Sequence, residues 1–186
     1  MALGLWLGLG VAALALIFVF YFIGKRNSFI RYENTIDNSW AQIDVQLQRR
    51  GELIPNLVET VKGYAAHEKG VFAAVSDARA RMMGASSPDA KMAADNMLTQ
   101  ALGKLFAVAE AYPQLKANEN FLQLQDELSH TENNVAFARQ HYNDAVLQYN
   151  NAIQQFPGSV VAGARQKKTM LQVPEASKAV PRVSFA

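Results

Sequence analysis

The chain opens with an apolar segment, since residues 1–24 carry no ionisable side chain. Its central run, residues 3–23, would rise roughly 32 Å as a helix, about the thickness of the hydrocarbon core of a bilayer. Trp6 lies near one end of this run and Tyr21 near the other, where amphipathic rings favour the lipid–water interface. A cleaved signal peptide fits poorly, because neither a basic n-region nor a small-residue cleavage site flanks the run. The pattern predicts a transmembrane anchor over residues 1–25.

Basic residues predict the orientation of this anchor. Lys25, Arg26 and Arg31 follow the apolar run, and only two uncharged residues precede it. The positive-inside rule therefore predicts a cytoplasmic domain and an external N-terminus.

Small residues recur every fourth position within the predicted span, at Gly4, Gly8 and Ala12. Such a face lets two membrane helices approach closely and dimerise. The same pattern also arises by chance, because small residues are frequent in membrane helices. It is therefore only a weak indication of an oligomer face.

Apolar residues then recur at helical spacing through three long stretches, at residues 28–83, 88–112 and 118–156. The third stretch alternates spacings of three and four over five heptads, which is typical of a seam facing another helix. No stretch between residues 25 and 156 alternates in the manner of a strand. The predicted fold is all-α: an N-terminal transmembrane helix followed by an antiparallel bundle of three to four long helices with coiled-coil-like packing.

Turn residues predict the boundaries of these helices. Ser87 and Pro88 resemble an N-cap and the first helical position, and Pro157 with Gly158 stops the last helix. The bundle is accordingly expected over residues 26–156. The remaining residues, 157–186, contain three of the six prolines and five basic residues against one acidic residue. They predict a basic, proline-containing C-terminal tail.

The first stretch keeps its apolar seam through two residues that disfavour a helix, Gly51 and Pro55. They cost about 1 and about 3 kcal/mol respectively in a helix interior. The proline ring also clashes with the carbonyl of Gly51, four residues earlier. We therefore predict a kink at Gly51 and Pro55 that sets two segments of the helix at different angles.

One charged residue, Arg50, falls on the apolar seam of the first stretch. An arginine in that position must extend its charge to solvent or pair with a carboxylate across the interface. Glu132 and Asp144 of the third stretch are the expected partners. A ligand site is one interpretation, and a buried pair of Arg50 with Glu132 that fixes helix register is the favoured one.

Composition excludes several kinds of chemistry. The chain has no cysteine, so disulfides and zinc thiolates are excluded, and its net charge of +2 argues against a nucleic-acid partner. Phosphate-binding glycine loops and nucleophile motifs are absent. Three histidines form no metal-binding pair, and His130 with Asp126 is best explained as a surface contact. We expect no catalytic residue, no metal and no cofactor.

Several sequence blocks resemble the LemA family. They are residues 40–68, residues 110–125, Thr131-Glu132-Asn133, Arg139, Tyr142-Asn143, Tyr149-Asn150 and the ending Pro181–Phe185. The resemblance implies a bacterial protein with an N-terminal anchor and an antiparallel helical bundle. It implies little about biochemistry, because the family has no established enzymatic activity. Magnetosome-membrane relatives suggest membrane organisation by analogy.

These observations predict a single-pass protein of the bacterial inner membrane that acts as a non-enzymatic scaffold. Its expected partners are the lipid bilayer and further copies of itself, with another membrane protein as a further candidate. The alternative is a hydrolase or metal-dependent enzyme. Its polar residues would be Glu59, His67, Glu68 and Arg50, which fall near one region of the first stretch.

Overall fold

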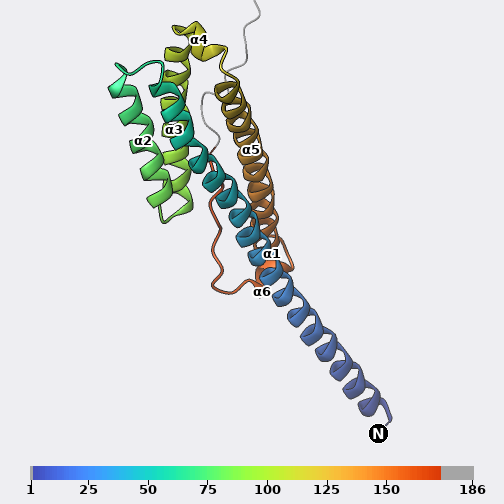
Figure 1. Cartoon of the computed structure of the whole chain (residues 1–186). Coiled ribbons are helices and arrows are strands. Elements are labelled where there is room, and N and C mark those ends of the chain that lie inside the picture. The colour runs from blue at the N-terminus through green and yellow to red at the C-terminus, as the bar shows by residue number, and fades with distance from the viewer. Residues whose placement is uncertain (1, 173–186) are drawn as a thin grey trace, which may run out of the picture. The chain divides into compact units, whose positions relative to one another are not determined.

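The computed structural model describes residues 2–172 (Figure 1). The part of the predicted tail from residue 173 onwards, with the Pro181–Phe185 ending, lies outside the described residues. Within residues 2–172 every regular element is a helix: α1 (Ala2–Lys62), α2 (Lys69–Gly84), α3 (Pro88–Glu110), α4 (Pro113–Lys116), α5 (Glu119–Gln154) and α6 (Gly158–Val161). The predicted all-α fold is confirmed.

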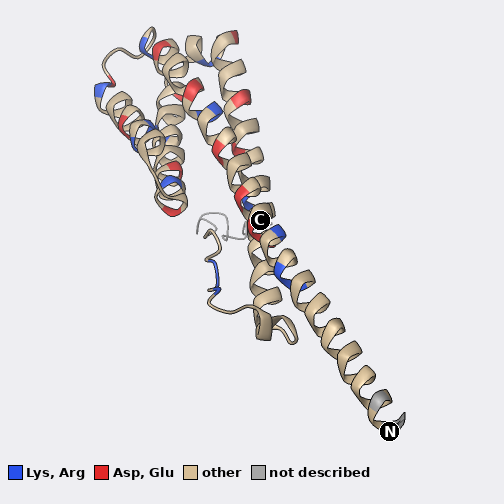
Figure 2. Cartoon of the chain, turned by 90° about the horizontal axis from the view of Figure 1, so that it is seen from below, with Lys and Arg blue, Asp and Glu red and all other residues tan. Residues whose placement is uncertain are grey.

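The N-terminal part of α1 has the properties of a membrane-spanning helix. It is long and apolar enough to cross a bilayer, and none of its apolar window is buried against the rest of the protein. Large apolar side chains such as Trp6 and Phe20 are mostly exposed. Figure 2 shows this stretch free of charged residues up to a group of Lys and Arg. Lipid is therefore the environment that this surface favours.

The prediction of one helix over residues 28–83 is wrong. α1 ends at Lys62, and α2 begins at Lys69. At the break the Tyr64 amide bonds to the carbonyl of Val61, three residues back, at 3.0 Å, which tightens the last turn. The sequence carried the signal, a lysine in the last turn followed by Gly63, which is a common helix ending. The apolar spacing hid it, because Val61 and Ala65 on either side are both buried.

The described residues form two compact units. The first, called here the bundle unit, contains residues 40–141 together with 171–172. The second, called the anchor unit, contains residues 2–39 and 142–170. α1 and α5 each contribute to both units.

Contacts between helices give the directions of the bundle unit. α2 runs back along α1, since the side chain of Arg79 bonds to the carbonyl of Gly51. α3 runs parallel to α1, because Lys91 pairs with Asp44 and, further along both helices in the same direction, Asp95 pairs with Arg50. α5 runs antiparallel to α1, as shown by the hydrogen bonds Asn118–Tyr64 and Asn134–Gln46. The four helices therefore alternate in direction around one core.

Capping explains where α3 and α5 begin. The side chain of Ser87 accepts a hydrogen bond from the Ala90 amide at 3.3 Å, and Pro88 occupies the first helical position. In the same way the Asn118 side chain accepts from the Phe121 amide at 3.0 Å. The core between the helices is made of apolar side chains from all four, among them Leu47, Leu57, Val75, Leu98, Leu105 and Val135.

The anchor unit is held together by the segment that follows α5. Asn150 of α5 forms two 2.9 Å hydrogen bonds with the backbone of Lys168, one to its carbonyl and one from its amide. Arg165 pairs with Glu33 of α1 at 3.0 Å and lies over the ring of Phe29, 5.2 Å from its centroid. The predicted tail is therefore attached to α1 and α5 over these residues.

Tyr149 lies in the same unit and is almost fully buried. Burial raises the pKa of its phenol, and the nearby carboxylate of Glu33, which shares a hydrogen bond with it, raises it further, while Arg165 acts in the opposite direction. The phenol is therefore neutral and donates to Glu33 at physiological pH.

Candidate functional site

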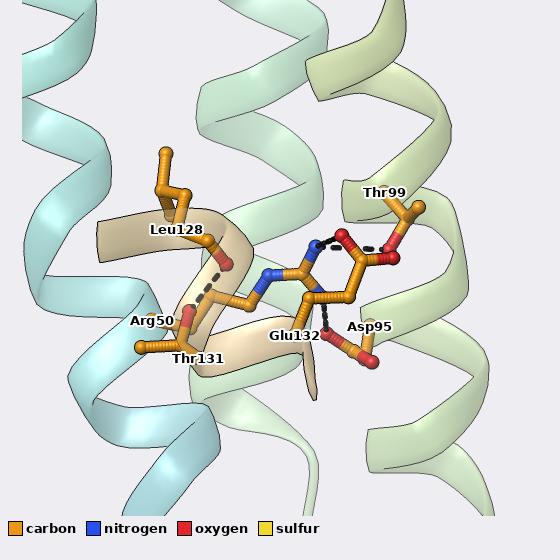
Figure 3. A network of polar contacts seen from close by, with 6 residues as sticks. All are labelled: Arg50, Asp95, Thr99, Leu128, Thr131 and Glu132. Carbon is orange, nitrogen blue, oxygen red and sulfur yellow. Dashed lines mark hydrogen bonds and ion pairs between the residues drawn. The ribbon is translucent and has the colours of Figure 1, made fainter. Parts of the chain in front are cut away.

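The most unusual feature of the bundle unit is a buried arginine. Arg50 is 1% exposed and projects from α1 towards α3 (Figure 3). Its Nη1 donates to Oδ1 of Asp95 at 2.5 Å, and its Nη2 donates to Oγ1 of Thr99 at 3.1 Å. Glu132 of α5 accepts a longer bond from Nη2 at 3.4 Å. One guanidinium thus joins three helices.

Helical spacing explains this convergence. Arg50 follows Ile43 and Leu47 on the buried face of α1 at steps of four and three residues. On α3, Asp95 and Thr99 are four residues apart and so share one face. The planar guanidinium has five N–H donors in a fork, which suits it to bridging acceptors on different helices.

The prediction named Arg50 and Glu132 as buried polar residues. In the structure Arg50 is buried, but Glu132 is not. Asp95 is 3% exposed, whereas the Glu132 side chain is 54% exposed. Asp95 is therefore the main partner of Arg50, and the sequence did not point to it. The other expected partner, Asp144, belongs to the anchor unit. A role of Arg50 and Glu132 in helix register stays a prediction.

A second arginine acts on the same carboxylate. Burial lowers the pKa of the Arg139 guanidinium, and the charge of Asp95 opposes this shift. Arg139 also donates a hydrogen bond to the backbone carbonyl of Gln172, at the end of the described chain. Asp95 thus balances part of the charge of both Arg50 and Arg139.

The Arg50 guanidinium is incompletely paired. Its Nε is buried and has no hydrogen-bond partner among residues 2–172. An unpaired buried donor has a free-energy cost of about 1–3 kcal/mol. Taking two opposite charges out of water is also costly, so the network is better suited to specifying one arrangement of helices than to adding stability.

The neighbouring arginine has a different environment. Arg49 pairs with Glu127 of α5 at 2.9 Å, and both side chains are well exposed. They border an open hollow of about 650 Å³, whose lining also includes Glu52 and Asn56. An exposed ion pair of this kind contributes between 0 and about 1 kcal/mol to stability.

Gly51 and Pro55 have a packing role that the sequence did not reveal. Pro55 has no N–H, so the carbonyl of Gly51 loses its helical partner, and Nε of Arg79 donates to that carbonyl at 2.6 Å. A Cβ on Gly51 would lie 2.7 Å from the sulfur of Met83, at the end of a flexible side chain, so α2 packs closely on α1 at this point. α1 continues through Pro55 to Lys62. The kink itself stays a prediction.

This arrangement leads to a test by double substitution. Arg79→Met keeps an apolar stem but removes the donor, so it should lower the free energy of unfolding by about 1–3 kcal/mol. In a Pro55→Ala background the backbone regains an amide that can bond to the Gly51 carbonyl, and the same substitution should cost much less. Chemical unfolding followed by circular dichroism would measure both. An equal cost in the two backgrounds would show that Arg79 does not replace the missing helical bond.

The other predicted residues do not come together as a site. A Cβ built on Gly4 or Gly8 would contact nothing within 4 Å, and Ala12 is exposed, so the weak oligomer face stays a prediction. His67 is exposed, and Glu59 pairs with Lys62 at 2.7 Å on the surface. Arg50 is in the core and away from solvent.

No metal centre is visible in residues 2–172, which contain no group of three or more His, Cys, Asp or Glu side chains able to hold an ion. The ion pair between His130 and Asp126, at 3.6 Å, is exposed on α5. The polar network described above is therefore the candidate functional site, and its geometry is suited to holding helices together.

The family model described as "LemA family" matches residues 39–185, about four-fifths of the chain. The chain belongs to the LemA family. The match covers the helices of the bundle unit, including Arg50, Asp95 and Arg139, and it confirms the resemblance seen in the sequence blocks.

The named relatives are about one-quarter identical to this chain. Magnetosome protein MamQ 2 of Paramagnetospirillum magneticum is 26% identical over 162 residues, covering 73% of this chain and 60% of the relative. Magnetosome protein MamQ of Magnetospirillum gryphiswaldense is 25% identical with the same coverage. Protein LemA of Metamycoplasma hominis is 24% identical over 147 residues, covering 77% of this chain and 67% of the relative. The chain thus spans about three-fifths of the length of its magnetosome relatives.

Proposed function

We propose that this LemA-family protein is a non-enzymatic, membrane-anchored scaffold that self-associates in the bacterial inner membrane and organises the membrane or a membrane-protein partner. One observation carries the proposal. A single helix, α1, contains both an apolar span with no buried residue and Arg50, the centre of the buried network. The element that would enter the bilayer is therefore part of the bundle itself. The names of the magnetosome relatives support a membrane role by analogy.

The proposal includes an orientation. Lys25, Arg26 and Arg31 directly follow the apolar span of α1. By the positive-inside rule the bundle unit lies in the cytoplasm and the N-terminus outside. Reporter fusions at the two ends of the chain distinguish this orientation from its reverse.

An exposed apolar surface supports self-association. On the bundle unit, an open groove of about 500 Å³ lies between α1 and α5, lined in part by Val45 and Phe137. These side chains are 59% and 65% exposed, although both are large and apolar. Contiguous exposed apolar surface is typical of protein–protein contact sites. The chemistry of this groove fits the apolar face of a second helix.

Light scattering of the detergent-solubilised full-length protein tests this proposal. We expect a protein mass that is a multiple of the 20.5 kDa chain. Phe137→Ser should shift the equilibrium towards the single chain, because it removes the largest apolar side chain of the groove. Leu122→Ser, at another exposed apolar position of α5, is the matched control and should leave the mass unchanged. A single chain at every protein concentration would contradict the proposed self-association.

A further inference from the structure

The turn between α5 and α6 exposes two large apolar side chains to the surroundings of the protein. Phe156 is 83% exposed, the highest value for a large hydrophobic residue within the described chain, and Val160 is 66% exposed. The turn is nevertheless well ordered by its neighbours, because Gly158 between them is buried. A fixed turn that holds two apolar side chains outwards is typical of a contact surface.

The turn lies beside the first turns of α1 that follow the apolar span. Gly158 packs against Phe29, whose ring lies 3.7 Å from the position of a Cβ on that glycine. Phe29 is six residues beyond Ile23, the last residue of the apolar run, which is about 9 Å along the helix axis. The headgroup layer of a bilayer is roughly 5–8 Å thick on each side. Phe29 therefore lies close to the outer edge of the lipid headgroups when the span is in a membrane, and the turn beside it is within reach of them.

The charges of this region are positive. Of the acidic residues on the same part of α1, Glu33 pairs with Arg165 at 3.0 Å, and Asp37 lies 3.9 Å from the amine of Lys168. Lys25 and Arg26, close to the end of the apolar run, form no ion pair with any residue from 2 to 172. An anionic lipid surface offers negative headgroups, which attract unpaired cations, and an apolar region below them, which favours exposed apolar side chains.

We propose that the turn of residues 155–160 is a second membrane contact, in which Phe156 and Val160 enter the headgroup region of a bilayer while Lys25 and Arg26 bind anionic phospholipid. Ile30, which is 43% exposed on α1 beside Phe29, adds to the apolar surface at this height. The contact fixes the anchor unit against the membrane surface at a second point, in addition to the span. It rests on the proposed membrane anchoring and goes beyond it.

The absence of cysteine allows a direct test. A single cysteine at position 160 (Val160→Cys) is labelled with a polarity-sensitive fluorophore in the full-length protein, in lipid nanodiscs that hold one chain each. Leu147→Cys is the matched control, since Leu147 is exposed on α5 of the same unit, nine residues before Phe156. We expect shallow nitroxide-labelled lipids to quench the probe at 160 and aqueous iodide to quench the probe at 147.

Further substitutions in the 160-labelled protein test the role of each group. Phe156→Ser should lower the ratio of turns in contact with lipid to turns exposed to water on the order of tenfold. The reason is that the variant has no aromatic ring to transfer from water into lipid. Phe156→Leu should keep most of the quenching, and Leu147→Ser should change nothing. Exchange of phosphatidylglycerol for phosphatidylcholine, or Lys25→Gln with Arg26→Gln, should weaken the contact.

Each outcome supports or overturns the proposal. A probe at 160 that is as open to iodide as the probe at 147 overturns it. Protection from iodide without quenching by lipid also overturns it, because protein then covers the turn. Equal quenching in phosphatidylglycerol and in phosphatidylcholine overturns the proposed binding of anionic phospholipid. Protein that fails to co-elute with the discs contradicts the anchor itself, and this failure is distinct from that of the turn.

Discussion

Replacing Asp95 with alanine should lower the free energy of unfolding by about 3–5 kcal/mol, because it leaves the buried charge of Arg50 without its main partner. Asp95 accepts the 2.5 Å bond from Arg50 and also balances Arg139, so its loss affects two cations. Asp95→Asn keeps an acceptor but no charge and should have a smaller effect. Thermal and chemical unfolding of the solubilised protein, followed by circular dichroism, would measure the difference.

Two controls separate the charge from the shape of this site. Glu132→Gln changes the exposed partner of Arg50 and should cost less than about 1 kcal/mol. The double variant Arg50→Met, Asp95→Leu removes both charges together and should be far more stable than Asp95→Ala. If Asp95→Ala and Glu132→Gln had the same small effect, the buried pair would not hold the helices.

Gly158→Ala should release the segment after α5 from the anchor unit, with a local free-energy cost of about 1–3 kcal/mol. A Cβ at this position would lie well inside the contact distance of the Ala152 carbonyl oxygen, which is backbone and cannot rotate away. Phe29 closes the other side. Hydrogen exchange of residues 158–170, or the rate of tryptic cleavage after Arg165, would report the release.

Gly51→Ala is the matched control for this substitution. The atom nearest to its new Cβ is the sulfur of Met83, at the end of a flexible and partly exposed side chain. This side chain can move, and the alanine also favours the helix by up to about 1 kcal/mol. We expect little change in exchange at residues 158–170 for Gly51→Ala. Similar exchange in Gly158→Ala and the unchanged protein would contradict the steric argument.

Sequence periodicity predicted the class of fold and most of the helical residues, because each helix buries one continuous apolar face. It failed where that face continues across a break, as at Val61 and Ala65 on either side of Gly63. The spacing of apolar residues indicates which residues are buried. A turn between two buried residues leaves this spacing unchanged, so the spacing does not reveal the turn. The local signal, a lysine and then a glycine, was the better guide.

The candidate site was predicted in part for a related reason. Arg50 was identified because a charge on an apolar seam is conspicuous within one helix. Its main partner was missed because pairing depends on which helices are neighbours, and the sequence pattern of one helix does not show that α3 lies beside α1. A weak signal existed: Lys91, Asp95 and Thr99 recur every fourth residue on α3, and the first two are buried. Polar residues at such spacing are usually a solvated face, so sequence alone favours the wrong interpretation.

The connectivity of the two units affects how the protein could ever leave a membrane. The chain passes from one unit to the other within α1, within α5 and again after Met170, so each unit is assembled from segments far apart in the sequence. A protease that cut between residues 39 and 40 would remove the α1 half of the anchor unit. Tyr149 of α5, now buried, would then lose its hydrogen-bond partner Glu33 of α1. A single cut at this position would therefore release a fragment in which the anchor unit is incomplete.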